Sequence, residues 1–202
     1  FQIADLTFED VSNVTAILSS DPSGIVAFYV NNFSIRRVQV INAKGNGGIT
    51  VSGSLSGGLP TEDNLWIEDC ILLGTSAGNW MEGDGINVGN YQNVHVTGCY
   101  ITGTGRHAFE GGGSLRDTFF FGNFIDMQGR GFSGINPTGA VRSTVIGNIV
   151  LNVAAPYYGI DYTSDAGLFP LLDLTVIGNQ VTSTTATYAM RIQNTSGVGS
   201  DV

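Results

Sequence analysis

Four ionisable residues, Asp84, His107, Glu110 and Asp161, carry side chains from which an acid–base site could be built. Hydrolysis of a glycosidic bond uses two carboxyl groups, one of which is protonated at the start of the reaction. An imidazole near them could carry a proton or bind an anionic group. Each of the four residues lies in or beside a short apolar segment typical of a β-strand, so their chemistry depends on which strands are neighbours.

The strands belong to an internal repeat. The phrase Gly147-Asn148-Ile149-Val150 recurs closely at 122–125 and 178–181, and more loosely at 98–101 and 69–72. Aligning these phrases places repeat starts 24 to 32 residues apart, at Asp5, Asn32, Asn64, Asn93, Asp117, Arg142 and Asp173. After each start the residues alternate between polar and apolar, as in a strand with one buried face. A repeat of this length predicts units that stack on one another.

Two further strands follow in most repeats: a short one after the Gly-Asn phrase, and one led by Gly, such as Gly85-Ile86-Asn87-Val88. The sequence therefore predicts an all-β parallel β-helix of about seven coils with three strands per coil. Asn123, Asn148 and Asn179 should form an inward corner ladder of hydrogen-bonded amides. Cys70 and Cys99 occupy the same ladder position one coil apart, as free thiols or as a disulfide.

Composition narrows the possible partners. The net charge of −9 argues against nucleic acid or an anionic membrane as a partner. No apolar run reaches the roughly 18 residues needed to span a bilayer. The chain is poor in Lys and has sequons at Asn13, Asn32 and Asn194, which suits an extracellular or virion-surface location. We expect one domain over residues 1–202, as part of a longer chain, since Phe1 opens it without a signal-peptide pattern.

The Gly-Asn corner ladder, the Gly-Ile-x-Val strands and the repeat length resemble the right-handed parallel β-helices of the pectin lyase-like superfamily. This resemblance implies a right-handed coil whose Gly-led strands form the sheet that bears the active groove. Gly83-Asp84-Gly85-Ile86 and Gly105-Arg106-His107 resemble both polygalacturonase-type hydrolases and phage tailspike depolymerases. The chain lacks the Asp-Asp pair and the Gly-His-Gly of polygalacturonases, and Gln193 stands where they have Lys.

This arrangement gathers the candidate site residues on one outward face. The expected catalytic residues are Asp84, Glu110, Asp161 and His107, and the expected substrate-binding residues are Arg106, Arg130, Arg191, Asn87, Asn136, Tyr158 and Tyr188. Glu110 and Asp161 should lie two coils apart, or roughly 9–10 Å between backbones. That spacing suits the inverting type of glycosidase, whose carboxyls are about 6.5–9.5 Å apart. No metal or other cofactor is expected, unless the protein is a lyase that uses Ca²⁺.

Three functions remain open from the sequence. The first is a polysaccharide-processing hydrolase or depolymerase acting on an acidic glycan. The second is a non-catalytic tailspike, adhesin or glycan-binding module, and the third is a polysaccharide lyase. A second outward column, with Phe119, Phe121, Ile146 and Ile177, is apolar and should mark a contact, either with neighbouring copies in a homotrimer or with a covering loop.

Overall fold

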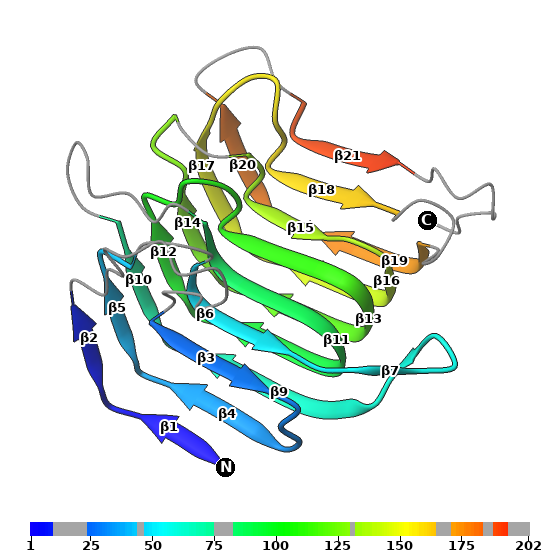
Figure 1. Cartoon of the computed structure of the whole chain (residues 1–202). Coiled ribbons are helices and arrows are strands. Elements are labelled where there is room, and N and C mark those ends of the chain that lie inside the picture. The colour runs from blue at the N-terminus through cyan, green and yellow to red at the C-terminus, as the bar shows by residue number, and fades with distance from the viewer. Residues whose placement is uncertain are drawn as a thin grey trace.

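A computed structural model of the protein describes residues 1–9, 24–43, 47–74, 83–129, 132–164, 171–183 and 188–193. Every regular element in these ranges is a strand, which confirms the all-β prediction. The strands stack in sequence order from the N-terminal end to the C-terminal end (Figure 1). Within the described ranges, no helix has the length and apolarity needed to cross a bilayer.

The larger sheet has twelve strands, and all of its pairings are parallel. Its main path runs through β1 (Gln2–Ala4), β4 (Phe33–Arg36), β9 (Glu62–Glu68), β11 (Asp84–Thr97), β13 (Phe109–Phe121), β15 (Ile135–Pro137), β18 (Ile160–Thr163) and β21 (Met190–Gln193). Four more strands branch from this path: β3 (Ile25–Phe28), β6 (Gly47–Ser52), β16 (Ala140–Ile146) and β19 (Leu172–Ile177).

The two long strands β11 and β13 explain the branching, because each pairs with different partners along its length. The first half of β11 pairs with β6 and its second half with β9. The first residues of β13 pair with β15 and its later residues with β16. Both strands bend between these parts (Figure 1). The sheet thus contains two rows of stacked strands that meet at β11 and β13.

The second sheet has seven parallel strands, which form a third row. Its order is β2 (Thr7–Glu9), β5 (Gln39–Ile41), β10 (Ile71–Leu73), β12 (Tyr100–Thr102), β14 (Phe124–Asp126), β17 (Ile149–Val153) and β20 (Gln180–Ser183). A small antiparallel hairpin of β7 (Leu55–Ser56) and β8 (Leu59–Pro60) projects from the stack.

The core consists of like residues stacked between the sheets. In the larger sheet, successive pairings align the fully buried side chains of Ile49, Ile86, Phe109, Ile135 and Ile160. The smaller sheet contributes a second buried column of Val40, Leu72, Ile101, Ile125 and Val150. Because each strand buries one face and pairs through its backbone, the apolar alternation in the sequence sets the register of the stack.

The predicted amide ladder is present at the corner before the second sheet. Asn123 Nδ2 donates to Asn148 Oδ1 and Asn148 Nδ2 donates to Asn179 Oδ1, each at 2.9 Å. Cys99 continues the ladder, because its backbone N–H donates to Asn123 Oδ1. Cys70 and Cys99 are buried free thiols, in agreement with the first of the two expectations for them.

The other corner explains the residue types at the repeat starts. Six of the predicted starts have φ between 51° and 62°, a left-handed conformation that Asn and Asp adopt more readily than most residues: Asn32, Asn64, Asn93, Asp117, Arg142 and Asp173. The start at Asp5 is wrong. Gln2–Ala4 pair with residues 34–36, which places Asp5 beside Arg37, where Arg37 Nε donates to Asp5 Oδ1 at 2.6 Å. Leu6, assigned to a buried face, is exposed.

The apolar second surface lies on the larger sheet. Phe121, Ile146 and Ile177 are paired neighbours on β13, β16 and β19, and the rings of Phe119 and Phe121 stack at 5.9 Å. Phe121 is 50% exposed and Ile177 57% exposed. Trp66 and His95 extend the aromatic row beyond Phe119. No described segment of the chain covers Phe121 or Ile177 fully.

Candidate functional site

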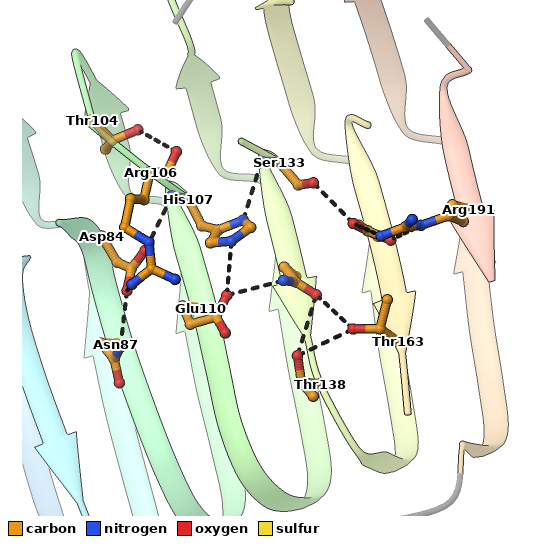
Figure 2. Close-up of polar contacts among 12 residues, drawn as sticks. Asp84, Asn87, Thr104, Arg106, His107, Glu110, Ser133, Thr138, Thr163 and Arg191 are labelled. Carbon is orange, nitrogen blue, oxygen red and sulfur yellow. Dashed lines mark hydrogen bonds and ion pairs between the residues drawn. The ribbon is translucent and has the colours of Figure 1, made fainter. Parts of the chain in front are cut away.

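The candidate catalytic residues come from adjacent strands of the larger sheet. Asp84 begins β11, His107 precedes β13, and Glu110 lies within β13. Asn87 pairs with Glu110 and Glu110 pairs with Asn136, so these three residues are aligned across β11, β13 and β15. Figure 2 shows these side chains together on one face. One ligand atom from each of Asp84, His107 and Glu110 lies within 4.8 Å of the others, and we call these three residues the acid cluster.

Asp84 is the most deeply buried member of the acid cluster. Its Oδ1 accepts a hydrogen bond from the backbone N–H of His107 at 3.1 Å, and its Oδ2 accepts one from Asn87 Nδ2 at 2.9 Å. Arg106 Nη1 lies 3.8 Å from Oδ2 (Figure 2). These donors and the nearby cation compensate a negative charge on Asp84, which burial would otherwise disfavour.

The His107 side chain lies between Glu110 on β13 and Ser133, which comes just before β15 (Figure 2). Its Nδ1 accepts a hydrogen bond from the Ser133 backbone N–H at 3.1 Å, and its Nε2 lies 3.2 Å from Glu110 Oε2. The ring contacts Phe132, with 5.4 Å between centroids. Burial and then the Arg106 charge lower the pKa of His107 from 6.5 to about 4. The imidazole is therefore neutral near pH 7.

The pKa of Glu110 is shifted in the opposite direction from that of His107. Burial and then the Asp84 charge raise the pKa of Glu110 from 4.5 to about 8, against the opposing effects of Arg106 and Asn136. Its carboxyl group is therefore largely protonated at pH 7, the state required of a general acid. Its side chain retains 17% exposure, whereas that of Asp84 retains 1%. Glu110 is thus the more accessible carboxyl of the cluster.

Asn136 is positioned to support Glu110. Its Nδ2 donates to Glu110 Oε2 at 3.0 Å. The hydroxyls of Thr138 and Thr163 lie 3.4 and 3.5 Å from Asn136 Oδ1 and donate to it (Figure 2). In this arrangement the amide presents its N–H group to Glu110.

Asp161 lies outside the acid cluster and is already paired. Arg191 donates to it at two points, Nε to Oδ1 and Nη2 to Oδ2, both at 2.7 Å. Ser133 Oγ donates to Asp161 Oδ2 at 3.1 Å, and Asp161 is only 4% exposed. The Arg191 guanidinium also lies over the Tyr158 ring at 4.4 Å. This ion pair gives both residues a structural role and leaves Arg191 little freedom to bind a ligand.

The remaining predicted binding residues have different surroundings. Tyr158 and Tyr188 are stacked, with 6.4 Å between centroids, and Tyr188 is 77% exposed. The Arg106 side chain is 45% exposed and lies 5.8 Å above the Phe132 ring. Arg130 lies outside the described residues. Arg106 is therefore the cation beside the acid cluster that is best placed to meet a ligand.

The donor set of the cluster suits proton transfer better than metal binding. Asp84, His107 and Glu110 are metal-ligand types, but a neutral imidazole has only one nitrogen lone pair in the ring plane. His107 uses this lone pair, at Nδ1, to accept the Ser133 N–H. In this arrangement His107 therefore has no lone pair left for a metal ion.

Sequence reasoning missed the residues that orient the cluster. Ser133 acts on His107 through its backbone N–H, a group that every residue except proline has, so no residue type marks it. Phe132, Thr138 and Thr163 also contact the site residues without a distinctive spacing. Only the alignment of neighbouring strands in the repeat could have indicated them.

Comparison of the chain with protein-family models, with curated proteins and with solved structures finds no match.

Proposed function

We propose that the chain is a right-handed parallel β-helix of the pectin lyase-like superfamily, with about seven coils of three strands. Support comes from the two rows of strands in the larger sheet and the single row in the smaller sheet, stacked in the same order. The Gly-Asn corners and the ladder of Asn123, Asn148 and Asn179 add to it.

On this scaffold the protein is a polysaccharide-processing domain, a hydrolase or depolymerase that cleaves an acidic glycan at the cell or virion exterior. The observation that carries this proposal is the acid cluster, in which a carboxyl group with its pKa raised to about 8 lies beside a second carboxyl. Glu110 donates its proton to the glycosidic oxygen as the bond from that oxygen to the anomeric carbon breaks. Water supplies the hydroxyl group for the anomeric carbon and a proton that returns to Glu110.

Asp84 is the favoured partner carboxylate. Its nearest approach to Glu110, within 4.8 Å between oxygens, is short for an inverting pair and closer to the ~5–5.5 Å of retaining glycosidases. In the structure Arg106 lies beside Asp84, and the carboxylate is buried. We infer that an anionic group of the glycan draws Arg106 away from Asp84, which couples substrate binding to exposure of that carboxylate. Asn87, Asn136, Tyr158 and Tyr188 line the same face, and Arg191 and Asp161 brace it.

The alternative function is a non-catalytic tailspike, adhesin or glycan-binding module. The full burial of Asp84 and the pairing of Asp161 with Arg191 favour it, because they leave Glu110 as the only partly accessible acid of the three. A lyase has weaker support. It needs a base, whereas His107 presents an N–H and Glu110 is protonated near pH 7.

A screen of acidic polysaccharides distinguishes these functions. The hydrolase releases reducing ends without new absorbance at 235 nm, whereas a lyase product absorbs there. Glu110→Gln should abolish release of reducing ends and retain binding. Binding of a glycan by the wild-type protein without any cleavage would overturn the hydrolase proposal and establish the binding module.

A further inference from the structure

His107 adjoins the proposed general acid, yet its surroundings suit neither a base nor a ligand. A backbone N–H can only donate, so the Ser133 N–H at 3.1 Å requires an unprotonated Nδ1 on His107. A neutral imidazole carries its single hydrogen on the other nitrogen, Nε2. That nitrogen lies 3.2 Å from Glu110 Oε2, so the Nε2–H group is the part of His107 nearest to this oxygen.

Glu110 Oε2 therefore has two N–H groups beside it: Asn136 Nδ2–H donates to it at 3.0 Å, and His107 Nε2 lies 3.2 Å away. The His107 group cannot be reversed, because the Ser133 N–H sets the imidazole tautomer. An oxygen beside two N–H groups is disfavoured as the site of a carboxyl proton. Oε1 receives no hydrogen bond from any described residue, and the Glu110 side chain is partly exposed.

We propose that His107 is a positioning residue, whose neutral imidazole keeps the Glu110 proton on Oε1, the oxygen free to deliver it to a substrate. This inference rests on the proposed function of Glu110 but concerns a hydrogen-bond arrangement that exists without substrate. The charged groups around the pair are Asp84 on β11, Arg106 at the entrance to β13 and Asp161 on β18. In the proposed reaction His107 neither gains nor loses a proton; it fixes which oxygen reacts.

The first test is ¹⁵N NMR of the whole chain labelled at histidine. The chain has two histidines, so a His95→Gln variant assigns the signals. We expect His107 to show an unprotonated Nδ1 and a protonated Nε2, and to remain neutral from pH 8 down to pH 5. Ser133→Ala retains the backbone N–H and should leave this tautomer unchanged. A protonated Nδ1, or charging of His107 between pH 6 and pH 8, would overturn the inference.

The second test is titration of the Glu110 carboxyl by ¹³C NMR, with Glu110→Gln to assign it. The wild-type midpoint should be about 8. His107→Leu removes a donor that stabilises the ionised carboxylate, and should raise the midpoint by about one pH unit. His107→Gln, whose amide can still donate, should restore part of the difference. A midpoint in His107→Leu that is unchanged or lower would contradict the proposal.

These measurements separate the two proposals. If no glycan is cleaved while the tautomer and the Glu110 midpoints behave as expected, the hydrogen-bond arrangement stands and the hydrolase proposal fails. If glycan is cleaved but the His107 tautomer is the opposite one, the hydrolase stands and the positioning role fails.

Discussion

Asp84 and Glu110, on neighbouring strands β11 and β13, each place a carboxylate oxygen within 4.8 Å of the other. Burial, and then the negative charge of Asp84, raise the pKa of Glu110 to about 8. Together, burial and the pairing of the two strands give an acid that is largely protonated at neutral pH.

Replacing Glu110 tests its role as the general acid. Glu110→Gln keeps the shape of the side chain but cannot transfer a proton, so cleavage of an acidic glycan should fall by about 10²- to 10⁴-fold. Reducing-end release under saturating substrate measures the effect. Glu68→Gln is the matched control, because Glu68 pairs with Arg36 in another part of the sheet. An equal loss of activity in both variants would contradict a specific role for Glu110.

Asp84 should control the protonation of Glu110. Its negative charge is the second cause of the raised pKa of Glu110, after burial. Asp84→Asn removes that charge, so the Glu110 midpoint should move down from about 8 while remaining above 4.5, since burial persists. Carboxyl ¹³C titration measures the midpoint. Asp63→Asn, which removes an acid that is not among the causes of the Glu110 shift, is the control and should leave the midpoint in place.

The stability of the protein should decline between pH 6.5 and pH 8. In this interval folded Glu110 retains a proton that the unfolded chain, with an ordinary pKa of 4.5, has already released. The unfolding free energy should therefore fall by about 2 kcal/mol as the pH rises. Between pH 4.5 and 6.5 His107 opposes this effect, because the unfolded chain binds a proton that the folded state, with a pKa of about 4, does not.

Urea unfolding at a series of pH values measures this dependence. The contributions of Glu110 and His107 nearly cancel from pH 4.5 to 6.5, so together they should leave the wild-type unfolding free energy level there. Above pH 6.5 the unfolding free energy should fall. In Glu110→Gln the fall above pH 6.5 should disappear, and stability should instead rise up to pH 6.5. An unchanged profile in the variant would show that Glu110 is not the group responsible.

The Asp161–Arg191 ion pair should contribute to stability. Arg191→Ala leaves a nearly buried carboxylate with Ser133 as its main donor, so it should destabilise the fold by about 2 kcal/mol. Adding Asp161→Asn to Arg191→Ala should recover part of the lost stability, because it removes the unpaired charge. The control is Arg37→Ala, because Arg37 contacts Asp5 with the same two-point geometry in an exposed setting and should matter much less. If urea unfolding showed the same loss of unfolding free energy in Arg191→Ala and Arg37→Ala, burial would not explain the contribution of the Asp161–Arg191 ion pair.

We propose that copies of the chain associate as a trimer through the surface containing Phe119, Phe121, Ile146 and Ile177. The support is the exposed apolar area on β13, β16 and β19. Light scattering should give a trimeric mass, and Phe121→Ser with Ile177→Ser should give a monomer. Leu59→Ser, which removes an exposed apolar side chain from the β7–β8 hairpin, should leave the mass unchanged. A wild-type monomer at high concentration would exclude this assembly.

Much of the stack could be predicted because its signals are local and repeated. The Gly-Asn phrase aligned Asn123 with Asn148 and Asn179, and the same alignment correctly placed Glu110 between Asn87 and Asn136. The prediction failed at Asp5, because Gln2–Ala4 already form the strand that pairs with residues 34–36. Leu6 and Phe8 alternate with polar residues as they would at the start of a strand. Asp5 is instead a corner residue that pairs with Arg37.

The sequence alone determined which residues share a column, because burial of one strand face and backbone pairing leave a single workable register. It could not determine what each side chain does within that column. Asp161 and Glu110 are both acids on the same face, yet one is neutralised by two bonds from Arg191 and the other has a pKa of about 8. That difference arises from burial and the Asp84 charge at Glu110 and from the position of Arg191 at Asp161, and these depend on distances across strands that only the tertiary structure sets.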